Sequence, residues 1–122
     1  MVESRSDLTR GLTEYTCTGV VDRAEITDAV DGFYADTPTP NVIWDLADAN
    51  VSALSAADVE VLADHTVSRA HSRDEGKTAI IAPKDMGYGL SRMFQTFTDL
   101  AKHQAAVRVF RTRDDALEWI DE

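Results

Sequence analysis

The hydrophobic residues of this chain fall into short blocks, and polar residues, glycine or proline close each block. The central block, residues 42–46, is an almost unbroken apolar run, which is typical of a strand covered on both faces of a sheet. Residues 78–82, closed by Pro83, and residues 106–110 are two further short apolar runs. These blocks predict three buried strands.

The first part of the chain has the pattern of a hairpin. Residues 11–21 are rich in Thr, Tyr, Val and Cys, which favours a strand. Residues 2–4 are expected to form a short edge strand, with Ser6 and Asp7 in the turn between the two. This hairpin would be the antiparallel part of the sheet.

Helical periodicity separates the predicted strands. Residues with the spacing of a capping box stand before three helices: Asp22 with Glu25, Ser55 with Asp58, and Thr112 with Asp115. The first helix shows its apolar face at positions 26, 29, 30, 33 and 34. The second is expected to end near Gly76, a residue suited to a helix C-terminus.

Residues 84–92 are predicted to form a loop that leads into a third helix. The inner face of that helix is expected to carry large apolar side chains: Leu90, Met93, Phe94, Phe97 and Leu100. Gly87 and Gly89 are interpreted as loop glycines needed for tight packing or a positive φ. An alternative is that backbone amides of this glycine-rich stretch hold an anion.

The predicted order is β-β-α-β-α-β-α-β-α, within a single α/β domain over residues 1–122. Alternating strands and helices with right-handed crossovers give a mixed, mostly parallel sheet of four to five strands flanked by about four helices. Ligands of such sheets bind beyond the carboxyl ends of the strands. Asp45, Asp48 and Ser55 are expected near that edge and are therefore candidate ligand- or partner-binding residues.

Charge narrows the classes of partner. The net charge is −10, whereas binding to nucleic acid requires a basic face. An acidic protein is also disfavoured at anionic membrane surfaces. Solubility or a salt-adapted host explains the acidity, and an acidic patch for a basic partner is the alternative. No apolar run approaches the ~18 residues expected of a membrane span.

Cys17 is the only cysteine, so an intramolecular disulfide is impossible and a cytoplasmic location is expected. Its apolar surroundings favour a buried, unreactive thiol over a nucleophile. His65 and His71 are six residues apart on one helix and face different directions, so no metal site is expected.

No P-loop, dinucleotide fingerprint or serine-hydrolase motif occurs, so neither a cofactor nor a catalytic residue is predicted. Asp45 interrupts an apolar strand, which is costly unless its carboxylate is hydrogen-bonded. It is interpreted as a structural carboxylate that fixes the following loop, with a functional role as the alternative. Tyr88 and Arg92 are four residues apart and are expected to share a helix face. They are candidate binding residues, or else surface packing.

The order of these elements, with Val-Ile-Trp-Asp-Leu-Ala-Asp at 42–48 and a helix opening at Ser55, resembles the STAS domain. Bacterial proteins catalogued as STAS-like or SEC14-like are similar over residues 82–94 and 109–120. The resemblance implies a non-enzymatic regulatory module that binds a protein partner. In the anti-sigma-factor antagonists of this family, a switch serine follows an aspartate at this helix. Ser55 is the nearest match, although Leu54 stands in place of the aspartate.

Two further expectations concern ligands and assembly. Related SEC14-like domains enclose lipids, which implies a small-molecule or lipid-binding carrier or sensor as the alternative function. Its small apolar pocket would lie near residues 86–97, lined by Met86, Met93, Phe94 and Phe97. A homodimer through one helical face is compatible with the sequence.

Overall fold

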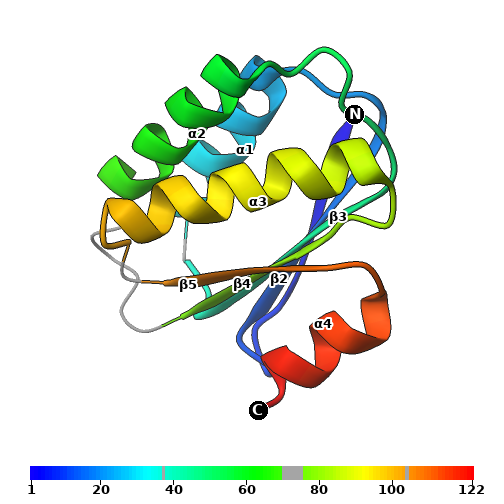
Figure 1. The fold of residues 1–122 in the computed structure, drawn as a ribbon. Coiled ribbons are helices and arrows are strands. Elements are labelled where there is room, and N and C mark those ends of the chain that lie inside the picture. The colour runs from blue at the N-terminus through cyan, green and yellow to red at the C-terminus, as the bar shows by residue number, and fades with distance from the viewer. Residues whose placement is uncertain (37, 70–75, 104) are drawn as a thin grey trace.

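A computed structural model of the chain describes residues 1–36, 38–69, 76–103 and 105–122. One five-stranded sheet has the order β1-β2-β3-β4-β5, and four helices pack against it, as Figure 1 shows. The predicted α/β class and element order are confirmed. The strands are β1 Val2–Asp7, β2 Leu12–Val20, β3 Asn41–Asn50, β4 Lys77–Ile81 and β5 Ala106–Phe110. The helices are α1 Arg23–Ala35, α2 Ala56–Arg69, α3 Asp85–Leu100 and α4 Arg113–Ile120.

The predicted hairpin is present, but its turn lies later in the chain. β1 runs antiparallel to β2 and includes Ser6 and Asp7, whereas β2 through β5 are parallel to one another. The Asp7 carboxylate accepts hydrogen bonds from the amides of Thr9 and Arg10, at 3.1 and 3.2 Å. Gly11 follows with a φ of +62°, a conformation that favours glycine. The side chain of Asp7 therefore begins the turn from the last strand position.

The central strand is longer than the apolar run predicted. β3 continues to Asn50 because it stays paired with β2 beyond an irregularity between Thr16 and Thr18. Asp45 and Asp48 consequently lie within the strand. Asp45 was expected within the strand, but the expectation that Asp48 lies in the loop after it was wrong, because backbone pairing with β2 continues through the polar residues.

The predicted caps are confirmed in all three helices that carry them. Asp22 accepts from the amide of Glu25 at 2.9 Å, and Thr112 accepts from that of Asp115 at 3.2 Å. Each bond satisfies an amide of the first helical turn, which otherwise has no intrahelical partner. The predicted end of α2 near residues 74–76 lies mostly outside the described residues.

The third helix begins earlier than predicted. α3 starts at Asp85, so Gly87 and Gly89 are helical and not loop residues. Gly87 is buried, and a Cβ placed there would lie 3.8 Å from that of Ala82 and 4.0 Å from Val51 Cγ2. The first turn of α3 thus belongs to the packed face of the helix. A Cβ at Gly87 would make ordinary van der Waals contacts there, so neither tight packing nor a positive φ requires this glycine.

The two faces of the sheet are covered by different numbers of helices. Figure 1 shows α1, α2 and α3 over one face and α4 alone over the other. Alternate side chains of β3 serve the two layers: Ile43 is completely buried towards α4, and Trp44 lies towards the three helices. The core between the sheet and α4 contains Leu12, Ile43, Ala79, Ile81, Ala116 and Ile120. Among the helices within the described ranges, none is long and apolar enough to cross a membrane.

The α4 side of the sheet should tolerate truncation poorly. We expect Ile43→Ala to lower the free energy of unfolding by about 2–5 kcal/mol, because a fully buried side chain leaves a cavity behind. Urea denaturation measures this loss. As a control, Val61→Ala removes a side chain that is 46% exposed on α2 and should change stability by no more than about 0.5 kcal/mol. Equal losses in the two variants would contradict the assignment of Ile43 to the core.

Candidate functional site

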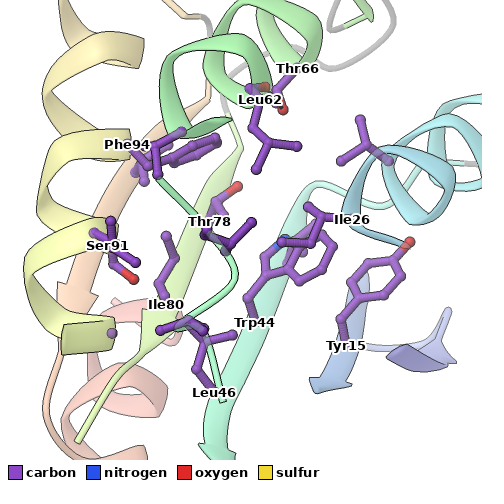
Figure 2. Close-up of a pocket in the computed structure, with 18 of the residues that line it drawn as sticks. Tyr15, Ile26, Trp44, Leu46, Leu62, Thr66, Thr78, Ile80, Ser91 and Phe94 are labelled. Atoms are coloured by element: carbon purple, nitrogen blue, oxygen red, sulfur yellow. Dashed lines mark hydrogen bonds between the residues drawn. The ribbon is translucent and has the colours of Figure 1, made fainter. Parts of the chain in front are cut away.

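An apolar cavity of about 110 Å³ lies between the sheet and the three helices on its deeper side. Figure 2 shows its wall, with Tyr15 and Trp44 on the strands and Leu62 and Phe94 on the helices. The remaining lining residues that the structure describes are also mainly apolar: Ile26, Val30, Phe33, Tyr34, Val42, Leu46, Val51, Leu54, Val59, Thr66, Thr78, Ile80, Gly87, Leu90, Ser91, His103 and Val107. Neither lysine, arginine, aspartate nor glutamate is part of this described lining. The described lining therefore carries no permanently charged side chain, and His103 is its one imidazole.

An aromatic platform forms the floor of the cavity. Tyr15 and Trp44 occupy paired positions on β2 and β3, and their rings stack at 4.3 Å between centroids. Phe33 of α1 meets the edge of Tyr15 at 6.3 Å. Trp44 remains only partly buried although β3 is the central strand. Its exposure comes from the space that the helices leave above it.

Polar contacts outside the cavity join α1 to α2. Asp31 pairs with His65 Nε2 at 2.7 Å and with Arg69 Nε at 3.1 Å, and Arg23 pairs with Asp58 at 3.3 Å. These contacts lower the pKa of Asp31, chiefly through the hydrogen bond from His65. Of the side chains of α1, only Val30 is fully buried. These polar contacts thus lie on the outer side of α1, and its apolar side chains Ile26, Val30 and Phe33 face the cavity.

Ser55 is the cap of α2 and its side chain is exposed. Its hydroxyl accepts from the amide of Asp58 at 3.1 Å, and its own amide donates to the Asp58 carboxylate at 2.9 Å. This reciprocal pair is the capping box expected from the sequence. The bonds from Ser55 lower the pKa of Asp58. The exposed residues beside Ser55 are all small: Ser52, Ala53, Ala56 and Ala57.

Tyr88 interacts with a cation that the sequence did not suggest. The guanidinium of Arg111, from the segment after β5, lies 3.9 Å from the Tyr88 ring centroid. The same guanidinium donates to Pro83 O at 3.1 Å and to the Asp85 carboxylate at 2.8 Å. Arg92, the predicted neighbour of Tyr88, is exposed on α3. Arg111 therefore ties the first turn of α3 to the end of β5, a long-range contact that local spacing does not reveal.

Asp45 is on the opposite face of the sheet from the cavity. One carboxylate oxygen accepts from the amide of Ala47 at 2.9 Å, and the other lies 3.6 Å from Arg113 of α4. Arg113 also pairs closely with Glu14 of β2. Asp48 is exposed and is paired through the backbone with Thr18. The structure thus separates Asp45 from Ser55 and gives Asp45 hydrogen-bonding partners of its own.

The cavity differs in position from the apolar pocket considered from the sequence. Of the four side chains expected on its wall, Phe94 is the one present in the described lining, and Met86 is 58% exposed at the start of α3. The aromatic floor comes from β2 and β3. The sequence predicted strands at Tyr15 and Trp44, but it did not show that these two side chains face an unfilled space. Within the described ranges, no group of three or more His, Cys, Asp or Glu side chains could hold a metal ion.

Comparisons with known proteins support the fold and leave the family undetermined by sequence. No protein-family model matches the chain, and no curated protein matches it significantly. Among solved structures, an anti-sigma factor antagonist from Mycobacterium paratuberculosis matches with a TM-score of 0.59 and 18% identity. The match covers 100% of this chain and 94% of that one.

A second solved structure is the Bacillus cell fate determinant SpoIIAA in its phosphorylated form. It matches with a TM-score of 0.53 and 14% identity, over 98% of this chain and 99% of that one. Identities this low show a shared fold. The chain therefore has a STAS-like fold over its whole length, as the resemblance in its sequence implied.

The contacts of Asp45 lead to a first prediction for this region. Asp45→Ala should lower the free energy of unfolding by about 1–3 kcal/mol, because the Ala47 amide loses its acceptor. Asp45→Asn keeps an acceptor oxygen and should lose less. Urea denaturation of both variants distinguishes them. If Asp45→Ala unfolds at the same urea concentration as the wild type, the structural role is incorrect.

Cys17 should be unreactive in the folded protein. It is completely buried, and burial raises its pKa from 9.0 to about 11. The thiolate is the reacting form, so at pH 8 an aromatic disulfide reagent should modify native Cys17 at least about a hundredfold more slowly than the thiol in urea. The native rate should rise as the pH approaches 11. Rapid stoichiometric reaction at pH 8 without urea would show that the thiol is accessible.

Proposed function

We propose that this chain is a non-enzymatic regulatory module that acts by binding a protein partner. The observation that carries the proposal is the STAS-like fold, which aligns over the whole chain with an anti-sigma factor antagonist. Proteins of that description act on another protein, and the proposal transfers this mode of action without naming the partner. A cytoplasmic location is part of the proposal.

We place the partner contact at the start of α2. The exposed residues at 52, 53 and 55–57 are serines and alanines, whose small side chains allow the backbone of a partner to approach closely. Asp48 is exposed on the preceding strand. With a net charge of −10, this protein favours a basic partner surface. Tyr88 and Arg92, on the neighbouring helix α3, remain candidates for the margin of the contact.

Ser55 is proposed to act as a helix cap and not as a switch that partner binding requires. Its hydroxyl accepts from the Asp58 amide at 3.1 Å, and the carboxylate of the same residue accepts from the Ser55 amide at 2.9 Å. A phosphate on Ser55 would gain from the helix N-terminus but would be repelled by that carboxylate. One matching structure is of a phosphorylated protein, and the local charge of this chain argues for a different arrangement.

The contact is tested with two bulky, neutral substitutions on one helix. Ala56→Gln enlarges an exposed residue in the first turn of α2, and Ser68→Gln enlarges an exposed residue in its last turn. Both variants should fold as the wild type does, because neither position is buried. Tagged proteins are used to recover partners from an extract of the source organism, and the recovered amounts are quantified by mass spectrometry.

A near-stoichiometric partner is expected with the wild type and with Ser68→Gln. Ala56→Gln should recover about tenfold less, since truncating or blocking a central contact typically costs 1 kcal/mol or more. Ser55→Asp, which keeps a capping side chain, should recover the partner as the wild type does. The proposal fails if no partner approaches stoichiometric amounts, or if Ala56→Gln and Ser68→Gln behave alike.

A further inference from the structure

We propose that the cavity above Trp44 is a binding site for a small, uncharged, mainly apolar molecule, about the size of one aromatic ring. Such a site is separate from the partner contact at the start of α2, and neither proposal requires the other. Figure 2 shows the space between α1, α2 and α3 on one side and the strands on the other. The volume, the lining and one polar group each restrict the ligand.

Volume restricts the size of the ligand. The cavity measures about 110 Å³, and an engineered cavity of about 150 Å³ lined by apolar side chains binds benzene. Pockets for larger, drug-sized molecules are about 300–1,000 Å³. A nucleotide or a two-chain lipid is therefore too large to be enclosed, whereas a single substituted ring is not.

The lining restricts the charge of the ligand. None of the described side chains on the wall is a lysine, arginine, aspartate or glutamate, so a buried carboxylate or ammonium would meet no permanently charged counter-ion. The stacked rings of Tyr15 and Trp44 offer a flat aromatic surface. Leu62 and Phe94 lie across the space from it. An aromatic ring meets favourable contacts on both of its faces in such a site.

One polar side chain on the cavity wall can orient a ligand by hydrogen bonding. Ser91 of α3 lies on the wall and is only 5% exposed. Within the described part of the chain, its hydroxyl has no hydrogen-bond partner, whereas the wall hydroxyl of Thr66 donates to Leu62 O at 2.8 Å. A ligand that fills the cavity would cover this hydroxyl, and leaving it without a partner would then be unfavourable. A ligand carrying one hydroxyl next to its ring would satisfy it.

The floor of the cavity also supplies a selective spectroscopic signal. The chain has two tryptophans: Trp44 on the cavity floor, and Trp119 of α4, which packs against the core between α4 and the sheet. Their indole N–H resonances report on the two faces of the sheet separately. A Trp119→Phe variant assigns them, because the resonance that remains belongs to Trp44.

The experiment titrates toluene, phenol and benzoate into the ¹⁵N-labelled protein. Toluene and phenol should shift the Trp44 resonance saturably and leave that of Trp119 in place. Benzoate, which is similar in size but charged, should bind about tenfold or more weakly. Phenol should bind more tightly than toluene, because its hydroxyl can pair with that of Ser91. A Ser91→Ala variant removes the hydroxyl but keeps the cavity, so the two affinities should become equal.

A filling variant completes the test. Ser91→Leu occupies the space with the protein's own side chain, so it should abolish binding of all three probes and raise the melting temperature. Should that variant fail to fold, Leu62→Phe fills the opposite wall and serves the same purpose. The proposal is overturned if neither toluene nor phenol produces a saturable Trp44 shift. It is equally overturned if Trp119 responds as Trp44 does, or if a folded filling variant still binds.

Discussion

The structure depends on the burial of β3 between two different layers. Ile43 is fully buried in the core between the sheet and α4. Trp44, the next residue, faces the three other helices and stays partly exposed. Burying one large aliphatic side chain contributes about 1.5–3 kcal/mol, so the filled side supplies much of what fixes the strand. The other side can therefore keep an unfilled space without losing the fold. In this way one strand anchors the sheet with one face and forms the floor of a cavity with the other.

Charged contacts arrange the elements around this strand. Arg113 joins α4 to Asp45 and Glu14, and Arg111 joins the end of β5 to the first turn of α3. Asp31 joins α1 to α2 through His65 and Arg69. Exposed pairs of this kind each contribute little to stability. They join neighbouring elements outside the packed faces, whereas apolar side chains such as Phe33 and Phe94 pack around the cavity itself.

The sequence predicted the element order, the sheet and the caps, because these follow from local patterns. The apolar run at residues 42–46 predicted a strand buried on both faces, and the spacing of Ser55 and Asp58 predicted the start of α2. Local patterns failed where distant residues decide. β3 extends to Asn50 through pairing with β2, and α3 includes Gly87 because the helix packs against Ala82. The partners of Tyr88 and Asp45 are arginines of the C-terminal segment. A cavity, likewise, is a property of how three helices stand on a sheet, which no single segment encodes.

A crystal structure under xenon pressure would test most directly whether the two layers differ as described. Xenon enters apolar cavities that side chains leave empty. Density for xenon should appear between Trp44 and the helices α1, α2 and α3. None should appear below the sheet, between Ile43 and Ala116, where the core is filled. Absence of xenon above Trp44, or equal occupancy on both sides of the sheet, would contradict the picture of one filled layer and one hollow layer.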